Sequence, residues 1–404
     1  MDVVFMKRIL FISGSVGLGH AARDVAIAKQ LRKLNPEIEI IWLVDSPAAQ
    51  LLQSEGEVVH PDAALLPSNT ELFERTIGDG KYEVDLTDFS MEWQKIFPKR
   101  LEIYDQVAKK EKVDLVVGDE TYDICVEWYN HPEKRSFPFV MMVDFIGFQH
   151  VNHNPKTMLQ DYMLNRLWCR FITEHKDFYK DYLFIGELDD VPDQKFGILL
   201  PNKRAVAKEH VHFVGYTLNF DPADYADKTV VRAKLGYGNE PLVVCSVGGT
   251  QVTKPLLDLC AEAFPIVKRG IPELRMVLVC GPGIAPESIK AVDGIEVRGF
   301  VPRLYEHLAA SDLSITSGGG TTTLELTALQ KPFLYFPLEK HLEQEKEVAA
   351  RCERMKAGVR MTFSDTTPHK LAMAILDHLN RKVNYPRIPV DGARQAAERI
   401  NKSL

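Results

Sequence analysis

Short runs of apolar, often β-branched residues recur along the chain, and segments with a helical spacing of apolar positions separate them. Runs that are apolar at almost every position are typical of strands buried on both faces of a parallel sheet, because a strand with one solvent face would alternate. The pattern therefore predicts an α/β protein with two doubly wound, Rossmann-like sheets. The predicted strands fall within residues 8–13, 37–44, 113–119, 137–145, 182–186 and 211–215, then 242–249, 275–283, 295–300, 313–320, 332–338 and 358–363.

The chain length supports a division into two domains. At 404 residues, the chain is longer than single hydrophobic cores usually grow. Between the two halves lies a polar stretch with Pro222 and Pro241, as expected of a linker. We therefore predict an N-terminal domain over residues 1–220, a C-terminal domain over residues 221–382, and a tail over residues 383–404 whose short amphipathic helix could pack back across the domains.

Composition and charge argue against several classes of binding partner. The net charge is −7 and the basic residues form no stripe, so we predict no nucleic-acid partner. The six cysteines are scattered without zinc-type spacing, which favours a reducing compartment and no structural metal. Because no apolar run approaches the ~20 residues of a membrane span, we expect a cytoplasmic protein, with peripheral membrane contact left open. The oligomeric state cannot be read from the sequence.

A glycine-rich turn, SGSVGLGH, connects the first predicted strand to a helix over residues 13–20. In doubly wound sheets, ligands bind at the carboxyl ends of the strands, where this turn lies. The spacing, which includes Gly17 and Gly19, differs from the G-x-G-x-x-G of dinucleotide-binding folds. The histidine at the start of the helix, His20, has two interpretations. It is a general base, or it is merely a polar residue in the first helical turn.

Two glycine turns in the second half predict a phosphate site. Gly249 and Thr250 follow one predicted strand, and the sequence GGGTTT at residues 318–323 follows another and leads into a helix. Unpaired N–H groups at a helix N-terminus, together with threonine hydroxyls, suit a diphosphate. One turn later, Glu325 could accept hydrogen bonds from ribose hydroxyls. An ordinary solvated glutamate is the alternative interpretation.

Taken together, these stretches resemble the GT-B nucleotide-sugar glycosyltransferases, and within them the UDP-glycosyltransferase and MurG-like group. The resemblance is strongest over residues 242–360, where GFVPRLYEHLAASDLSITSGGGTTTLELTALQKPFLYFPLEKHLEQ is similar to the family's donor signature. It is slight between residues 50 and 240. It implies two facing domains with a cleft between them, the N-terminal one for the acceptor and the C-terminal one for the donor.

The resemblance also implies roles for individual residues. His20 would be the general base that deprotonates the acceptor hydroxyl, and Asp119, at the end of a later strand, would orient it. Glu325 would hold the ribose. The full set of donor-binding residues would be Gly249, Thr250, Phe300, Val301, Ser317, Gly318, Gly319, Gly320, Thr321, Thr322, Glu325, Glu343 and Gln344, with Phe300 and Val301 beside the base and Glu343 and Gln344 at the donor sugar. Ser317 stands where many members carry histidine, and Glu343 where aspartate is commoner.

The predicted reaction is transfer of a sugar from a nucleotide-diphosphate sugar, such as a UDP-sugar, to an acceptor hydroxyl with inversion. No D-x-D motif follows a strand at a suitable place, so we expect neither a metal nor a cofactor, and the N–H groups and helix dipoles would stabilise the departing diphosphate. Two alternatives remain. One is a nucleotide-sugar 2-epimerase of the same architecture, and the other is a non-catalytic nucleotide-sugar sensor.

The acceptor, the sugar and the nucleobase are left open by the sequence. A small natural product, a lipid-linked sugar and a cell-wall precursor all fit. A group of aromatic residues suggests an apolar acceptor site, although core packing explains aromatic residues equally well. These residues are Trp93, Phe97, Phe145, Phe148 and Trp168. His150 and His153 have the spacing of a metal or acceptor site, but such a pair in a loop is more often neither.

Overall fold

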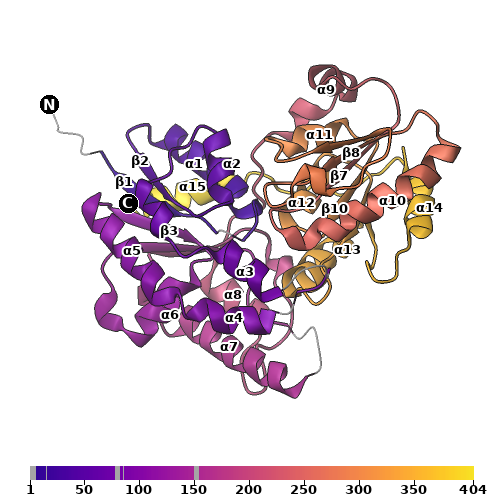
Figure 1. Cartoon of the computed structure of the whole chain (residues 1–404). Coiled ribbons are helices and arrows are strands. Elements are labelled where there is room, and N and C mark those ends of the chain that lie inside the picture. The colour runs from indigo at the N-terminus through magenta and orange to yellow at the C-terminus, as the bar shows by residue number, and fades with distance from the viewer. Residues whose placement is uncertain (1–5, 15, 78–81, 85, 150–153) are drawn as a thin grey trace. The chain divides into compact units, whose positions relative to one another are not determined.

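The chain forms two compact units, each built around a parallel sheet (Figure 1). The computed structural model describes residues 6–14, 16–77, 82–84, 86–149 and 154–404. The N-terminal unit comprises residues 1–73, 86–219 and 389–404, and the C-terminal unit comprises residues 74–85 and 220–388. Each unit carries a six-stranded sheet, which confirms the predicted α/β class with two doubly wound sheets.

The sheet of the N-terminal unit has the strand order β2-β1-β3-β4-β5-β6, and all its neighbours are parallel. The chain moves from β1 to β2 and then returns to the other side of β1 to form β3. The order therefore reverses between β1 and β3, and the carboxyl ends of these two strands mark the place where such sheets bind ligands. The strands are β1 (Arg8–Ile12), β2 (Glu39–Leu43), β3 (Leu115–Asp119), β4 (Phe139–Val143), β5 (Asp181–Phe184) and β6 (His212–Phe213).

Successive residues of these strands enter two different clusters, one on each face of the sheet. On β1, Leu10 and Ile12 belong to one cluster, whereas Ile9 and Phe11 belong to the other. Both faces are buried, which explains why the strands are apolar at nearly every position. Helices α1 (Gly19–Leu34), α2 (Ala48–Ser54) and α15 (Gly392–Lys402) contribute to the second cluster, and α5 (Phe97–Lys110), α6 (Tyr122–Asn130), α7 (Pro155–Thr173) and α8 (Lys203–His210) to the first.

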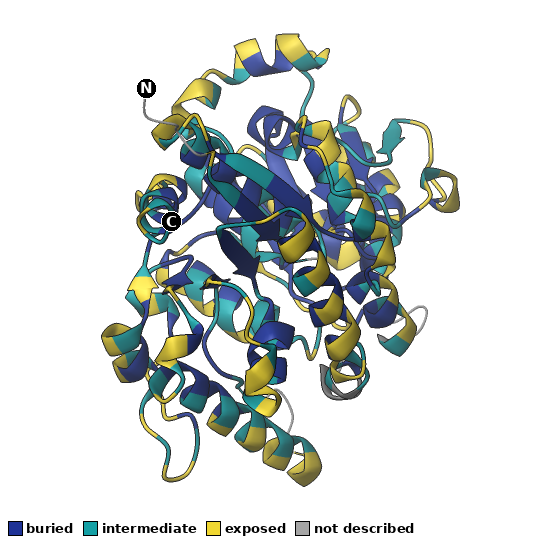
Figure 2. Ribbon diagram, turned by 90° about the vertical axis from the view of Figure 1, so that its left-hand side faces the viewer, coloured by how far each residue is buried: buried dark blue, intermediate teal, exposed yellow. Residues whose placement is uncertain are grey.

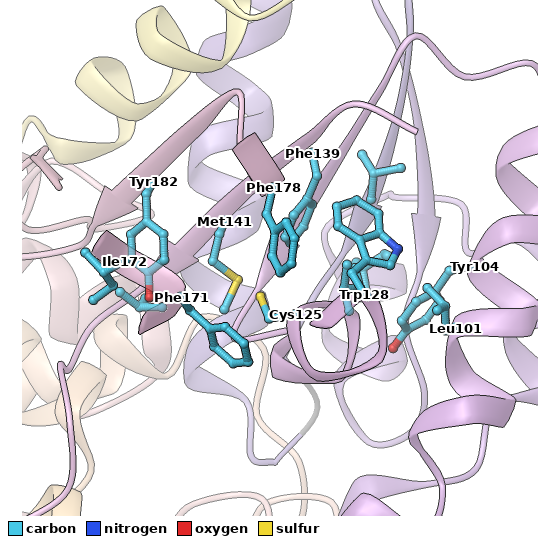
Figure 3. Close-up of a cluster of buried hydrophobic side chains, with 14 of the residues drawn as sticks. Leu101, Tyr104, Cys125, Trp128, Phe139, Met141, Phe171, Ile172, Phe178 and Tyr182 are labelled. Carbon is cyan, nitrogen blue, oxygen red and sulfur yellow. The ribbon is translucent and has the colours of Figure 1, made fainter. Parts of the chain in front are cut away.

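Figure 3 shows part of the first cluster, in which helices α5, α6 and α7 place aromatic and sulfur-containing side chains against β4 and β5. Two further helices, α3 (Asn69–Ile77) and α4 (Leu86–Gln94), lie between β2 and β3 in the chain. The side chains of the first cluster that Figure 3 labels are Leu101, Tyr104, Cys125, Trp128, Phe139, Met141, Phe171, Ile172, Phe178 and Tyr182.

The sheet of the C-terminal unit has the order β12-β11-β10-β7-β8-β9, so its direction reverses between β7 and β10. Both of these central strands are buried along their whole length, and Figure 2 shows the same concentration of buried residues in the strands. The strands are β7 (Leu242–Ser246), β8 (Arg275–Val279), β9 (Ile295–Arg298), β10 (Leu313–Ser317), β11 (Phe333–Phe336) and β12 (Val359–Arg360). The helices are α9 (Lys228–Leu235), α10 (Lys254–Gly270), α11 (Leu304–Ala310), α12 (Gly320–Ala328), α13 (Ala349–Arg354) and α14 (Pro368–His378).

Two segments belong to a different unit from the residues next to them in the sequence. Residues 82–84 pair with the C-terminal unit: Val84 N–H donates to the Glu339 carbonyl at 2.8 Å, and the Tyr82 hydroxyl donates to the carbonyl of Phe336 at 2.6 Å. Helix α15, near the C-terminus, packs on α1 of the N-terminal unit. Its buried residues recur with helical spacing at Ala393, Ala396, Ala397 and Ile400.

All six cysteines are buried and free. Among the described residues, no helix combines the length and the apolar character that crossing a membrane requires.

Candidate functional site

His20 lies at the start of α1, immediately after the glycine-rich turn that follows β1. Gly14 in that turn permits a close approach, because a Cβ atom at this position would lie 2.8 Å from Cγ of the His20 ring. Gly17 adopts a φ of +89°, a conformation that residues with a side chain rarely adopt. Gly19 is the first residue of α1. The turn therefore uses its glycines to fix the position of the imidazole.

The structure brings His20 and Asp119 together, as the sequence predicted. Nδ1 of His20 lies 3.0 Å from Oδ2 of Asp119. The cause is the strand order, since β1 pairs with β3 and Asp119 is the last residue of β3. The Asp119 side chain is fully buried, whereas that of His20 is 17% exposed. A buried carboxylate at Nδ1 and a partly exposed ring are the geometry that a general base requires.

Arg23, which sequence reasoning missed, connects this pair to a second carboxylate. Its Nε and Nη2 atoms donate to both oxygens of Asp119, at 2.8 and 2.5 Å, and its Nη1 donates to Asp144 at 2.5 Å. Nη2 also lies 2.8 Å from Nδ1 of His20. Two signals pointed to this cluster: Arg23 follows His20 by one helical turn, and Asp144 follows β4 as Asp119 ends β3.

Opposing charges set the protonation of His20. Burial and the Arg23 guanidinium lower the pKa of this imidazole, but the carboxylates of Asp119 and Asp144 outweigh them and raise it above its ordinary value. Burial alone would raise the pKa of Asp119, but the neighbouring Arg23 and His20 hold it below the ordinary value. Asp119 is therefore ionised, and it favours a proton on His20.

Two further acids border the cluster. Glu120, at a φ of +53°, has Oε2 3.8 Å from Nε2 of His20. Burial and the charge of Asp144 raise the pKa of Glu120 well above its ordinary value. Burial and Asp119 likewise raise the pKa of Asp24, which accepts a hydrogen bond from the Ser13 hydroxyl at 2.5 Å. The raised pKa values favour the neutral form of both acids, whereas the guanidinium of Arg23 lowers the pKa values of Asp119 and Asp144 and favours their ionised forms.

In the C-terminal unit, the loop after β10 forms the N-terminus of α12, with Gly319 as its N-cap. Gly318 and Gly319 of this loop differ in the space around them. A Cβ atom at Gly318 would lie 2.7 Å from Cα of Pro337, so packing requires glycine there. A Cβ atom at Gly319 would meet nothing within 4 Å. Packing does not explain the second glycine, and the backbone at this position is open to a close approach.

The same loop exposes part of a helix N-terminus. Gly320, Thr321 and Thr322 are half-buried and form the first turn of α12, whose N–H groups lack partners within the helix. The hydroxyl of Thr323 instead points back and donates to the carbonyl of Gly319 at 2.9 Å. Ser317, the last residue of β10, is buried. The accessible donors are therefore those of residues 320–322.

The second predicted phosphate turn follows β7, next to β10 in the sheet. A Cβ atom at Gly248 would meet nothing within 4 Å, which again leaves room for a ligand. Thr250 is buried and directly precedes a short 3₁₀ turn over Gln251–Thr253. Gly249 lies between them. The two predicted turns thus follow neighbouring strands at the place where the strand order reverses.

Glu325 lies within α12 and is 8% exposed. Burial raises the pKa of its carboxyl to about 8. The neutral form therefore predominates at neutral pH, and this form can both donate and accept a hydrogen bond. A vicinal diol such as that of ribose offers complementary groups. The structure thus excludes the alternative of an ordinary solvated glutamate.

Glu343 and Gln344 begin a single π-helical segment, Glu343–Val348. A Cβ atom at Gly320 would lie 3.4 Å from Oε1 of Glu343, so this carboxylate is beside the phosphate loop. The amide oxygen of Gln344 accepts a hydrogen bond from Leu338 N–H at 2.9 Å, so this side chain is tied to the segment that follows β11. A π-helical segment is often found at functional sites.

Arg351 is a second residue that the sequence did not reveal. Its Nη2 donates to the carbonyl of Gly320 at 2.6 Å, which places a cation at the phosphate loop. Guanidinium groups bind phosphate oxygens strongly, so Arg351 suits an anionic ligand here.

Phe300 and Val301, which were predicted to lie beside the nucleobase, are half-buried and follow β9.

The five aromatic residues predicted at the acceptor side form one group in the N-terminal unit around Tyr122. The ring centroid of Tyr122 lies 6.1 Å from that of Trp93, 6.3 Å from that of Phe145 and 4.8 Å from that of Trp168. Phe97 contacts Trp93, and Phe148 contacts Trp168. Because Tyr122 comes three residues after Asp119, the aromatic group extends from the neighbourhood of the histidine.

Within the described part of the chain, no three His, Cys, Asp or Glu side chains are grouped so that they could hold a metal ion. His150 and His153, whose role the sequence left open, lie outside the described residues.

The two sheets and the loops at their strand reversals define a GT-B glycosyltransferase fold. The glycosyltransferase SnogD from Streptomyces nogalater is 15% identical, covers 99% of this chain and 100% of its own, and superposes with a TM-score of 0.56. A putative UDP-N-acetylglucosamine 2-epimerase from Listeria monocytogenes is 13% identical, with 98% and 95% covered and a TM-score of 0.56. At such identities the likeness concerns the fold alone.

Sequence comparison identifies the family. The glycosyltransferase family 28 C-terminal domain matches residues 243–401. An uncharacterized glycosyltransferase from Methanosarcina mazei is 34% identical over 390 residues, which are 95% of this chain and 93% of that protein. A UDP-N-acetylglucosamine--N-acetylmuramyl-(pentapeptide) pyrophosphoryl-undecaprenol N-acetylglucosamine transferase from Clostridioides difficile is 24% identical, with 92% and 80% covered. The chain belongs to the MurG-like group of GT-B glycosyltransferases, and the family 28 match is confined to its C-terminal part.

Proposed function

We propose that the protein transfers a sugar from a UDP-sugar to an acceptor hydroxyl, with inversion at the anomeric carbon and without a metal. The observation that carries this proposal is the contact between Nδ1 of His20 and Asp119, because it leaves Nε2 of a partly exposed imidazole to act as the base. The relative from Clostridioides difficile is named for a UDP-N-acetylglucosamine donor. This compound is therefore the first donor to test.

In the proposed reaction, the donor binds to the C-terminal unit and the acceptor to the N-terminal unit. The acceptor oxygen attacks the anomeric carbon as its proton moves to Nε2 of His20. The bond between that carbon and the β-phosphate oxygen breaks, and UDP leaves with the electron pair. Attack on the face opposite the leaving group inverts the configuration. Asp119 holds the Nδ1 proton and stabilises the imidazolium that forms.

On the donor side, the charge that develops on the diphosphate is balanced without a metal in this proposal. Three features support it: the N–H groups of Gly320, Thr321 and Thr322, the dipole of α12, and the guanidinium of Arg351. Glu325 would hold the ribose. Its replacement by alanine should raise the dissociation constant of UDP at least about tenfold, since such bonds contribute about 1.5 kcal/mol each. Unchanged UDP affinity would remove this assignment.

The acceptor we propose is a lipid-linked sugar. Two observations support it: Tyr122, Phe145 and Phe148 of the aromatic group are only partly buried, and the relative from Clostridioides difficile is named for an undecaprenol-linked acceptor. A soluble natural-product aglycone is the alternative outcome of the same assay. The two are separated by comparing lipid-linked and aglycone acceptors in parallel.

The test is a product assay with purified protein, UDP-N-acetylglucosamine and an acceptor panel. Mass spectrometry should find an acceptor heavier by one sugar, and proton NMR should show a β-linkage from the α-linked donor. Activity should survive treatment with EDTA. Conversion of the donor to its 2-epimer without acceptor would identify an epimerase instead. Tight UDP binding without turnover over the whole panel would identify a sensor.

A further inference from the structure

The cluster around His20 contains one cation, Arg23, in contact with two ionised carboxylates. The guanidinium donates to both oxygens of Asp119 and to one oxygen of Asp144. The Arg23 side chain is 7% exposed, Asp119 is fully buried, and Asp144 is 23% exposed. Water therefore screens these charges little, and each contributes strongly to the potential at the imidazole.

The charges that face His20 come from three elements. Helix α1 supplies Arg23 and Asp24, β3 ends in Asp119 and is followed by Glu120, and the residue after β4 is Asp144. The pKa values of Asp24 and Glu120 are raised, which favours their neutral forms. With a neutral imidazole, two carboxylates and one guanidinium leave a net charge of −1. Protonation of His20 during the reaction brings the cluster to zero. A cluster that became neutral on protonation would favour the imidazolium of the transition state.

Without Arg23 the two carboxylates would carry a charge of −2 and would favour a proton on His20 more strongly. We propose that Arg23 is a positioning residue for the candidate base: by pairing with Asp119 and Asp144 it offsets part of their negative charge at His20, and so lowers the tendency of the ring to hold a proton in the resting enzyme. This inference rests on the proposed role of His20 as the base. It assigns to Arg23 an electrostatic function that a merely structural ion pair would not have.

Arg23 also orients the carboxylate that contacts the imidazole. Nη2 of Arg23 lies 2.8 Å from Nδ1 of His20, and Oδ2 of Asp119 lies 3.0 Å from the same nitrogen. Because both Nη2 and Nε of the guanidinium donate to Asp119, the carboxylate is held in one orientation. In the tautomer that donates Nδ1–H to this carboxylate, the lone pair of the neutral ring is on Nε2, and Nη2 of Arg23 is then a close neighbour of Nδ1 without a hydrogen bond to it.

Histidine titration in the ligand-free, full-length protein tests the charge count directly. The Cε1–H resonance of His20 is followed against pH by NMR of protein with ¹³C-labelled histidine, and it is assigned by its loss in His20→Gln. Arg23→Gln should raise the pKa of His20 by about one unit or more, and Asp144→Asn should lower it by a similar amount. The double variant restores the charge of −1 and should return the pKa to within about half a unit of wild type. Glu102→Gln, which removes an exposed carboxylate of the same unit, serves as the control.

Activity provides the second readout. The acidic limb of the pH profile of kcat/KM should move to higher pH in Arg23→Gln, to lower pH in Asp144→Asn, and back in the double variant. A purely structural role predicts loss of activity in all three without opposite shifts, and this result would overturn the proposal. If Arg23→Gln does not fold, Arg23→Lys keeps the charge and should leave the pKa of His20 near that of wild type, while Asp144→Asn still lowers it.

The experiment separates this inference from the proposed function. If His20→Ala transfers sugar at the wild-type rate, His20 is not the base. The NMR titration would then still show whether Arg23 and Asp144 shift the pKa of His20 in opposite directions. If the titration shows no opposite shifts and His20→Ala is inactive, the base assignment survives and the assignment of Arg23 fails.

Discussion

Nδ1 of His20 lies 3.0 Å from Oδ2 of Asp119, although 99 residues separate the two in the chain. The contact follows from the reversal of strand order, because β3 returns to the side of β1 opposite β2. The glycine turn after β1 and the last residue of β3 therefore meet at the same edge of the sheet. The first prediction concerns this pair.

His20→Ala should reduce kcat at least about 10²-fold, because it removes the general base. The dissociation constant of UDP should change by less than about twofold, since the predicted donor residues lie in the other unit. Steady-state kinetics and titration calorimetry measure the two quantities. His131→Ala, at an exposed histidine of the same unit, should match wild type in both. A His20→Ala enzyme with normal turnover would show that another group accepts the proton.

The pH dependence of stability should report the buried carboxyl of Glu325. Its pKa of about 8 in the folded protein is raised from an ordinary value of 4.5. Between these values the unfolded chain loses the proton and the folded chain keeps it, so the free energy of unfolding falls as pH rises, by up to about 1.4 kcal/mol per unit. Below pH 4.5 the carboxyl is protonated in both states, and its stabilising effect relative to high pH is fully present.

The glutamine in Glu325→Gln cannot ionise, so the free energy of unfolding of this variant does not fall with rising pH for this reason. Relative to wild type, its thermal midpoint should rise between pH 5 and pH 8, as measured by differential scanning calorimetry. The exposed Glu353→Gln is the control, and its difference from wild type should be the same at both pH values. A constant difference for Glu325→Gln as well would mean that Glu325 is ionised in the folded protein at neutral pH.

The segment over residues 82–84 should affect donor binding through β11. The Tyr82 hydroxyl donates to the carbonyl of Phe336, the last residue of β11, and the chain continues from there to Glu343 and Gln344. Tyr82→Phe removes this bond but keeps the ring that stacks on Phe363. Since a buried hydrogen bond contributes about 1 kcal/mol, the KM for the donor should rise severalfold with little change in kcat.

A matched control for this variant is Tyr225→Phe. It removes a hydroxyl that donates to Glu306 in the same unit, at 3.3 Å, away from the phosphate loop. Its donor KM should equal that of wild type. If Tyr82→Phe also leaves the donor KM unchanged, residues 82–84 do not support the loop that carries Glu343.

Some features of the fold and the site could be predicted from the sequence, and others could not. The predictable features depend on residues that are neighbours in the chain. Buried parallel strands are apolar at almost every position, so the two sheets could be predicted from the pattern alone. Asp119 was found because it ends such a strand and matches an aspartate of the family. The roles of these residues in transfer stay predictions, since the structure shows their geometry and not their reaction.

Arg23 and Tyr82 carry weaker signals: Arg23 lies one helical turn after His20, but that spacing alone does not show that its side chain is buried. A charged residue on the first helix is by default solvated, and only the carboxylates from β3 and β4 explain why Arg23 is buried. The contact of Tyr82 with Phe336 joins residues 254 positions apart. Such pairings depend on the three-dimensional path of the chain, and a strand-by-strand interpretation of the sequence cannot anticipate them.

The last prediction concerns helix α15, which supports the helix that carries His20. Ile400 is fully buried in the cluster that also contains Val25 and Ala28 of α1. Ile400→Ala should lower the free energy of unfolding by about 2–5 kcal/mol, because it leaves a cavity between the two helices. The thermal midpoint should fall by roughly 4 °C or more, whereas kcat well below that midpoint should change little. Glu398→Ala, at an exposed position of the same helix, should cost less than about 0.5 kcal/mol. Equal midpoints for the two variants would contradict the docking of α15 on α1.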